Sequence, residues 1–475
     1  MKIVEINSTE AYGGAETIMR AVSRYLQSAG HEVLWLVGRL HELKPSNSRV
    51  FKHDSKRNLW ARTCLSIADE LWEKVGVYKL GRGVCRFIIN EIGQPLRTLR
   101  HNLGHEDFEY PDTVTAVQRI QPAPEVLHLH GLHSRYFDLR ALKKLSEQYL
   151  IVVTMHDVWL VTGHCAYPGA CIGYTRGCGD CPDLDRFPKV KRDATAYNFR
   201  RKKEIYQSSR IHLVTPSRWL MDLVNTSEMS DVFQTQTVIP NGINTDIFSP
   251  GDTKEARNRL GLGAFDDVIL YCAKNARTNT HKDYDTARKG AEAYARANPE
   301  RKVILQVIGE ESGYEVSSNL VVRFVSLPGD SQSIVDYYRA CDVLVHTSLD
   351  ENFPTVVLEA MACAKAVIVS DTGGMREQVV SLSGDSQPEI DGADYGDRAN
   401  SNGILVRQKD VEGVSRALDC FLSDFELRNI LGKNGRNRVL ESYSMEHMGK
   451  EYESLFRSIS AQEPKKKQTE IYENR

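Results

Sequence analysis

Short apolar runs that do not alternate with polar residues are the feature that most restricts the fold of this chain. Val343-Leu344-Val345 and Val367-Ile368-Val369 are of this kind, and each is followed by a polar turn. Such strands are covered by helices on both faces, because an exposed face would place a polar residue at every second position. With a helix beginning near Pro354 between them, the two runs predict a parallel βαβ unit within residues 340–374.

Two carboxylates flank the expected start of that helix. Glu351 lies in the turn just ahead of it, and Glu359 lies on its second turn. Free N–H groups at a helix N-terminus suit a phosphate, and neighbouring carboxylates suit the hydroxyl groups of a sugar. The stretch therefore predicts a ligand that carries both phosphate and sugar, although a solvated acidic turn in an ordinary α/β domain would contain the same residues.

Length and composition place this unit in a larger globular protein. A chain of 475 residues that is 41% hydrophobic and 26% charged exceeds one ordinary core and predicts two domains. Its net charge of −2 argues against a nucleic-acid partner. The N-terminus enters a strand without the features of a signal peptide, and no apolar run approaches the ~20 residues of a membrane span. We therefore expect a cytoplasmic protein.

Strand signals fall into two groups separated by a turn-rich segment at residues 238–244. We predict an N-terminal domain over 1–237, a second domain over 238–443, a C-terminal helix over 444–460 that returns to the first domain, and a disordered tail over 461–475. The expected strands lie at residues 2–7, 31–37, 124–131, 150–155 and 212–217 in the first half, and at 267–273, 302–308, 320–325, 342–346, 366–369 and 403–406 in the second.

Glycines and histidines mark ligand-binding positions in the first half. Gly13 and Gly14 follow the first strand at the head of a helix, where they let a backbone approach a ligand closely. A plain strand-to-helix turn is the alternative, and the spacing is not that of a dinucleotide fingerprint. His128, His130 and His156 lie near the ends of later strands. Ligands bind at the carboxyl edge of a parallel sheet, which favours His130 and His156 as site residues.

Residues 50–104 predict a helical insertion that contains Trp60 and Trp72. Between residues 52 and 100, ten Lys and Arg stand against five Asp and Glu. Basic helices with aromatic residues can lie on an anionic membrane, whereas a solvated helical face is the commoner origin of such an excess. Peripheral association with the inner face of a membrane is therefore one of two interpretations.

Four of the ten cysteines cluster in a loop at residues 163–185. Cys165, Cys171, Cys178 and Cys181 include a C-x2-C pair, and four thiolates could ligate one structural zinc ion tetrahedrally. A reducing cytosol disfavours disulfides. The loop predicts a zinc site, with free thiols or a redox pair as the alternatives.

With these residues in view, the chain resembles the retaining glycosyltransferases of family 4. That family has the GT-B architecture, an α/β fold of two Rossmann-like, doubly wound domains facing across a cleft. The residues that carry the resemblance are Gly13-Gly14-Ala15-Glu16, His156-Asp157, Ile239-Pro240-Asn241-Gly242, Lys282, and Glu351 with Glu359 in the spacing E-x7-E.

The resemblance implies a role for each matching residue. Lys282 and Arg277 would bind the diphosphate of a nucleotide-sugar donor. Lys274 is an alternative to Arg277, because the surrounding loop departs from the Gly-Arg-Leu pattern that is usual in the family. Glu359 would hold the ribose hydroxyls, and Glu351 would hold the hydroxyls of the donor sugar.

The remaining implied positions lie around the transferred sugar and the diphosphate. His156 would contact the sugar or the acceptor, and Gly13 and Gly14 would let the backbone approach the diphosphate. The segment Asn352, Phe353 and Pro354 would line the donor site. No catalytic metal is expected in this family.

The predicted function is transfer of a hexosyl group from a UDP- or GDP-sugar to an acceptor glycan or glycolipid, with retention of configuration, in polysaccharide or glycoconjugate biosynthesis. A nucleotide-sugar epimerase of the same fold and an inactive scaffold that binds sugar nucleotides are the alternatives. The large region at residues 50–190 argues against the epimerase, and the joint presence of Glu351, Glu359 and Lys282 argues against the scaffold.

Overall fold

The computed structural model describes the chain except for Tyr12 and residues 42–46, 76–78, 265, 328–330, 383–397 and 463–475. The predicted disordered tail therefore lies outside the described residues from position 463 onward. None of the helices in the described part combines the length and apolar character needed to cross a bilayer.

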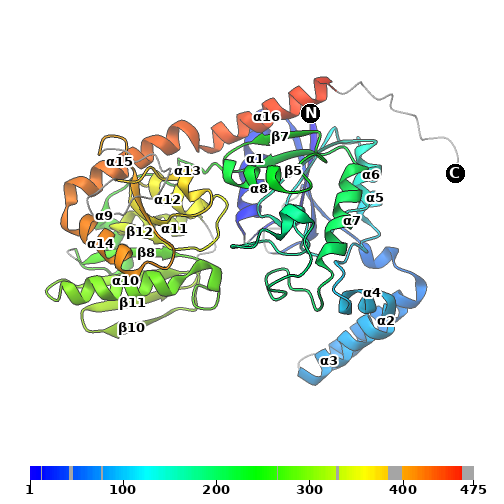
Figure 1. Cartoon of the computed structure of the whole chain (residues 1–475), viewed down its shortest axis with the longest axis horizontal. Helices are drawn as coiled ribbons and strands as arrows, with labels where there is room; N and C mark the ends of the chain where they lie inside the picture. The colour runs from blue at the N-terminus through cyan, green and yellow to red at the C-terminus, as the bar shows by residue number, and fades with distance from the viewer. Residues whose placement is uncertain are drawn as a thin grey trace. The chain divides into compact units, whose positions relative to one another are not determined.

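The chain folds into two compact units (Figure 1). The first comprises Met1–Thr215, Met221–Val238 and the C-terminal stretch that begins at Glu451. The second comprises Pro216–Leu220 and Ile239–Lys450. Each unit is built on one seven-stranded sheet. Two doubly wound α/β units of this kind are the predicted GT-B-like fold class.

The first sheet is parallel throughout and has the strand order β3-β2-β1-β4-β5-β6-β7. Its strands are β1 (Lys2–Thr9), β2 (Glu32–Arg39), β3 (Ser48–Val50), β4 (Val126–Leu129), β5 (Leu150–Thr154), β6 (His212–Thr215) and β7 (Thr235–Val238). The helices along this part of the chain are α1 (Gly14–Ser28), η1 (His53–Lys56), α2 (Leu59–Val75), α3 (Lys79–Phe87), η2 (Ile88–Ile92), α4 (Pro95–Asn102), α5 (Thr113–Gln118), α6 (Ala141–Ser146), η3 (Trp159–Val161), η4 (Gly173–Arg176), α7 (Thr195–Gln207) and α8 (Arg218–Thr226).

The second sheet has the order β10-β11-β9-β8-β12-β13-β14, and only the edge strand β10 is antiparallel to its neighbour among the described pairs. Its strands are β8 (Asp267–Cys272), β9 (Val303–Ile308), β10 (Gly313–Ser317), β11 (Leu320–Val325), β12 (Val343–His346), β13 (Ala366–Ser370) and β14 (Gly403–Val406). The helices are α9 (Thr253–Leu260), η5 (Thr280–Lys282), α10 (Tyr284–Ala297), α11 (Ser331–Ala340), α12 (Thr355–Ala362), α13 (Met375–Gln378), α14 (Val411–Ser423), α15 (Phe425–Ser442) and α16 (Met445–Gln462).

Helices cover both faces of the second sheet, as the unbroken apolar strands predict (Figure 1). Alternate residues of β8 enter different cores: Leu270 packs with α11 and α12, whereas Ile269 packs with α10 and α14. This arrangement explains why the strand has no polar side, because neither face meets water.

Each sheet has a topological switch point, where consecutive crossovers run to opposite sides. The switch lies between β1 and β4 in the first sheet and between β8 and β12 in the second. Ligands of open α/β sheets bind beyond the carboxyl ends of the strands at such a point. The turns that follow β8 and β12 carry Lys282 and Glu351, so the topology brings two predicted site residues to the switch point of the second sheet.

The Gly373-Gly374 turn after β13 packs directly on the turn after β12. A Cβ added to Gly373, whose φ is +56°, would lie 1.8 Å from the carbonyl oxygen of Glu351, and one added to Gly374 would lie 1.7 Å from that of Asn352. The Gly374 N–H donates a hydrogen bond to the Glu351 carbonyl at 3.2 Å. Glycine is therefore required here by backbone contact.

We predict that Gly374→Ala displaces the Glu351 turn and lowers the free energy of unfolding of the second unit by roughly 1–3 kcal/mol. Gly313→Ala is the matched control, because a Cβ there meets no atom within 4 Å. Urea unfolding measures both variants, and equal stability of the two would contradict the packing argument.

Candidate active site

The carboxylate of Glu351 is the centre of the polar cluster in the second unit. Lys282 forms an ion pair with Glu351 Oε1, while His346 Nε2 and Ser348 Oγ each lie 3.2 Å from the same oxygen. Burial raises the pKa of Glu351, but Lys282 and His346 outweigh burial and hold the pKa well below its usual range. Glu351 is therefore ionised at neutral pH.

The turns that carry Lys282 and Glu351 are held together by backbone contacts. The Leu349 N–H donates to the His281 carbonyl at 2.8 Å, and the Thr347 hydroxyl donates to the Asp283 carbonyl at 2.7 Å. Lys282 ends the short helix η5, and Asp283 follows it in the left-handed region at φ 47°. The Lys282 ammonium is thus positioned by its own turn as well as by its partner.

Glu359 occupies a different environment on the buried side of α12. The hydroxyl of Tyr338, which is fully buried, donates to Glu359 Oε2 at 2.5 Å. Burial raises the pKa of Glu359, and the hydrogen bonds from Tyr338 and Thr355 offset only part of this rise. The two carboxylates of the E-x7-E spacing therefore differ in character: Glu351 is strongly ionised, and Glu359 takes up a proton more readily.

Arg277 is paired with Glu310, a residue to which the sequence assigned no role. Its N–H and Nε–H donate to Glu310 at 2.8 and 3.2 Å, and its guanidinium lies 4.5 Å from the centre of the Phe324 ring. Lys274 is exposed to solvent.

The segment after Glu351 contributes mainly backbone groups to the candidate site. Phe353 packs in the core, and its carbonyl accepts a 2.9 Å hydrogen bond from Asn241. Asn352 Oδ1 accepts from Ser217 at 2.6 Å, whereas the buried Asn352 Nδ2 finds no partner among the described residues. Pro354 precedes α12, whose N-terminus carries no side-chain cap. That N-terminus therefore offers backbone N–H groups to a ligand.

In the first unit, the Glu16 carboxylate lies at the Gly13-Gly14 turn, where the sequence predicted the approach of a ligand. Glu16 on the first turn of α1 accepts hydrogen bonds from the Ser8 and Thr9 hydroxyls at 3.2 and 3.3 Å. A Cβ added to Gly13 would lie 2.1 Å from Glu16 Oε2, whereas one added to Gly14 would meet nothing within 4 Å. Gly13 thus makes room for Glu16, and Gly14 leaves open space at the start of the helix.

His156 belongs to a buried network that centres on Glu5 in the middle of β1. His128 Nδ1 and His130 Nε2 each lie 2.9 Å from Glu5 Oε2, and His130 Nδ1 lies 2.8 Å from His156 Nε2. Burial lowers the pKa of His130 to about 4 and that of His156 well below its usual value. Although burial raises the pKa of Glu5, the two histidines bring it to about 2. Both His130 and His156 are therefore neutral at pH 7.

The ligand atoms of Glu5, His128 and His130 also lie within 4.8 Å of one another, a spacing that could admit a metal ion. Each of the three side chains is fully buried and already has a partner within the network or in Thr154. Within the described residues, however, the buried Glu5 Oε1 has no hydrogen-bond partner.

The four clustered thiols are free and near one another. Burial and the neighbouring thiols raise the pKa of Cys165 to about 12, and burial raises that of Cys178 to about 11. The Gly163 and Gly173 N–H groups donate to the sulfurs of Cys178 and Cys171. Within the described residues, no three of these sulfurs lie within 4.8 Å of one another, so the thiols are grouped without being closed around an ion.

Sequence reasoning assigned no role to four residues that organise these clusters: Glu5, Glu310, Tyr338 and His346. A lone carboxylate inside an apolar strand was a usable signal for Glu5, and a strand-end position was one for His346. The same signal applies to Glu310, which follows the strand that ends at Ile308, whereas nothing in the sequence marks Tyr338, because it meets Glu359 through tertiary contact alone.

The histidine network predicts a pH dependence of stability. The unfolded chain protonates His130 below pH ~6.5, whereas the folded chain resists protonation down to about pH 4, so the free energy of unfolding falls as the pH falls through this window, by roughly 2–3 kcal/mol. His130→Gln removes this contribution. In His133, Asp157 outweighs burial and raises the pKa, so His133→Gln should change the slope in the opposite direction. Urea unfolding at pH 7.0, 5.5 and 4.5 measures the free energy of unfolding of the wild type and of both variants. If this free energy changed with pH in the same way in the wild type and in His130→Gln, the prediction would be refuted.

Comparison with known proteins places this site in a family. Residues 276–438 match the family described as "Glycosyl transferases group 1". A putative colanic acid biosynthesis glycosyl transferase of Escherichia coli K12, WcaC, is 25% identical over 298 residues, covering 58% of this chain and 69% of WcaC. D-inositol 3-phosphate glycosyltransferase 2 of Catenulispora acidiphila is 33% identical over 187 residues, covering 36% of this chain and 42% of that protein.

Solved structures agree at the level of the fold. HepE of Anabaena, solved in complex with UDP-glucose, has a TM-score of 0.60 at 15% identity, over 96% of this chain and all of that chain. A sucrose-phosphate synthase of Thermosynechococcus elongatus has a TM-score of 0.58 at 18% identity, over 97% of this chain and all of that chain. The matched residues include Lys282, Glu351 and Glu359. Residues 276–438 therefore match the group 1 glycosyltransferase family, and the chain as a whole has the GT-B-like fold of these solved structures.

Proposed function

We propose that this enzyme transfers a hexosyl group from a UDP- or GDP-sugar to an acceptor glycan or glycolipid in polysaccharide or glycoconjugate biosynthesis. The observation that carries the proposal is the contact between Lys282 and Glu351 at the switch point of the second sheet. A fixed cation beside a carboxylate that is ionised at neutral pH suits a ligand with a diphosphate and sugar hydroxyls. UDP-glucose bound to HepE supports such a donor, and the name of WcaC supports a polysaccharide acceptor.

The chemistry assigns distinct tasks to the residues of the second unit. Cleavage of the sugar–phosphate bond leaves negative charge on the nucleoside diphosphate, and Lys282 and the uncapped N-terminus of α12 would stabilise that charge. Arg277 would join them by exchanging Glu310 for a phosphate. Glu351 would orient the sugar hydroxyls, and Glu359 would hold the ribose hydroxyls.

The remaining assignments follow the family resemblance. His156 is placed on the acceptor side, where a neutral imidazole can accept or donate a hydrogen bond to a sugar hydroxyl without adding charge. Gly13 and Gly14 are placed near the diphosphate. Asn352 and Pro354 are placed at the donor, where the unpartnered Asn352 Nδ2 supplies a free donor group.

Incubation with a panel of nucleotide sugars and glycan acceptors tests the proposal. Lys282→Ala and Glu351→Gln should each lower turnover at least ~100-fold, because each removes a charge that acts on the donor in the transition state. Lys289→Ala and Glu255→Gln are matched controls, since both residues are exposed and form only surface pairs. Nucleotide release that requires an acceptor supports transfer. Wild-type rates in either site variant, or sugar interconversion without nucleotide release, would contradict it.

A structural zinc ion at Cys165, Cys171, Cys178 and Cys181 forms a second part of the proposal. Burial and neighbouring thiols raise the pKa of Cys165, Cys178 and Cys181 in this glycine-rich loop, and a divalent cation bound by the four cysteines would deprotonate them and tie the loop together. In this role zinc would supply structure and no step of the transfer.

Elemental analysis of the purified protein should find about one zinc per chain, and chelation should lower the thermal midpoint. Cys178→Ser should lose the metal, whereas Cys420→Ser, a partly buried cysteine outside the cluster, should retain it. Metal-free protein with an unchanged midpoint would refute the zinc assignment.

A further inference from the structure

The helices between residues 59 and 103, which we call the arm, carry an unusual surface. In Figure 1, α2 and α3 project from the rest of the first unit. Scattered exposed apolar residues are ordinary, but their concentration in one segment marks an interaction site. Ten of the eighteen exposed large apolar side chains in the described part of the chain belong to the arm: Leu59, Trp60, Ile67, Trp72, Val84, Phe87, Ile92, Leu96, Leu99 and Leu103.

Among the arm residues whose burial the structure describes, the buried ones are small. Ala61, Cys64 and Ala68 recur along one stripe of α2 and are buried, as is Cys85 of α3. A Cβ added to Gly93 would lie 3.0 Å from the Cβ of Cys64, so the chain approaches α2 closely here. The large apolar residues are therefore left outside, which is the reverse of a helical hairpin stabilised in water by its own core.

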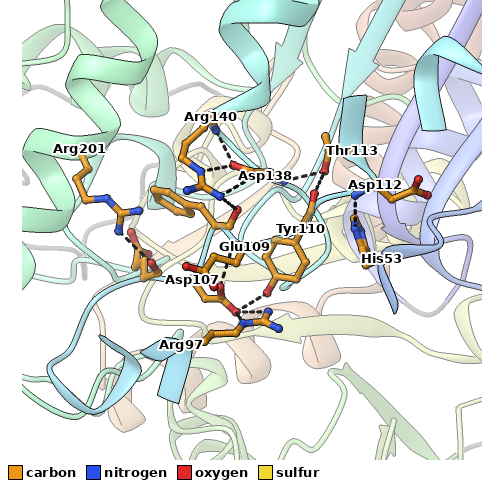
Figure 2. A network of polar contacts seen from close by, with 12 residues as sticks. His53, Arg97, Asp107, Glu109, Tyr110, Asp112, Thr113, Asp138, Arg140 and Arg201 are labelled. Atoms are coloured by element: carbon orange, nitrogen blue, oxygen red, sulfur yellow. Dashed lines mark hydrogen bonds and ion pairs between the residues drawn. The ribbon is translucent and has the colours of Figure 1, made fainter. Parts of the chain in front are cut away.

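The base of the arm is firmly attached to the first unit. Figure 2 shows Arg97 of α4 paired with Asp107, with a Nε–Oδ2 distance of 2.7 Å, and the Tyr110 hydroxyl donates to the same carboxylate at 3.1 Å. Arg100 forms a further ion pair with Glu109. The arm that carries the exposed apolar surface is thus fixed at its base by the ion pairs of Arg97 and Arg100.

Charge identifies the partner of this surface. The arm, residues 59–103, carries seven Lys and Arg against four Asp and Glu, an excess of three positive charges, although the whole chain has a net charge of −2, so the rest of the chain carries −5. Arg62 and Arg86 are exposed among the apolar side chains. Exposed apolar and aromatic side chains interleaved with cations suit anionic headgroups above acyl chains.

We propose that the arm docks on a bilayer that contains anionic phospholipids, with Trp60, Trp72 and Leu96 entering the headgroup region. The arm lies on the membrane, because no helix in the described ranges can span one. This inference goes beyond the proposed sugar transfer and does not rest on it.

Sedimentation with extruded vesicles tests the docking. The full-length protein should bind vesicles of phosphatidylcholine and phosphatidylglycerol at 7:3, and binding should be at least tenfold weaker to phosphatidylcholine alone or in 0.5 M salt. Tryptophan emission should shift to shorter wavelength on binding, since Trp60 and Trp72 are exposed without lipid. Failure of the wild type to bind the anionic vesicles would overturn the proposal.

A pair of matched triple variants locates the contact. Leu59→Ser with Trp72→Ser and Leu96→Ser should reduce vesicle partitioning at least tenfold without changing the thermal midpoint, because these side chains are exposed. The control replaces three exposed apolar residues of the second unit by serine, namely Val316, Phe425 and Leu440, and it should bind as the wild type does. Equal binding by the two variants would contradict docking through the arm.

Light scattering without lipid distinguishes the two possible partners of the arm, a lipid bilayer and a second copy of the chain. The proposal predicts that the wild type and the arm variant have the same mass across a concentration series. A wild-type dimer that the arm substitutions convert to a monomer would show that another copy covers this surface, and it would overturn the lipid assignment.

Discussion

The ion pair between Lys282 and Glu351 is the interaction on which the candidate site depends. It joins the turns after β8 and β12, the two strands that flank the switch point of the second sheet. The pair also fixes the charge state of Glu351, because burial alone would favour the protonated acid. Since Gly373 and Gly374 pack against the same turn, backbone geometry and electrostatics hold the carboxylate in one place.

The chain uses buried carboxylates in two ways. Glu351 and Glu5 are each paired with cationic or imidazole partners and stay ionised despite burial. Burial dominates at Glu359 and Glu16, whose partners are hydroxyl groups, and their pKa values rise. Both units thus place one strongly ionised and one less acidic carboxylate near a switch point.

The sequence predicted the fold class and most strands, because parallel strands buried on both faces leave unbroken apolar runs. It did not predict β3, β7 and β10, which are short or polar strands with partly exposed residues. The E-x7-E spacing and Lys282 were recognisable as a set, but their direct pairing was not, because it joins residues 69 positions apart. Occupation of the first glycine turn by Glu16 and pairing of Arg277 with Glu310 likewise arise only from tertiary contact.

A crystal structure of the protein with its nucleotide sugar tests the central claim most directly. The account predicts that a phosphate oxygen lies within hydrogen-bond distance of Lys282 Nζ, that sugar hydroxyls contact Glu351, and that ribose hydroxyls contact Glu359. A diphosphate bound away from Lys282, with the Lys282–Glu351 pair touching no part of the donor, would contradict it.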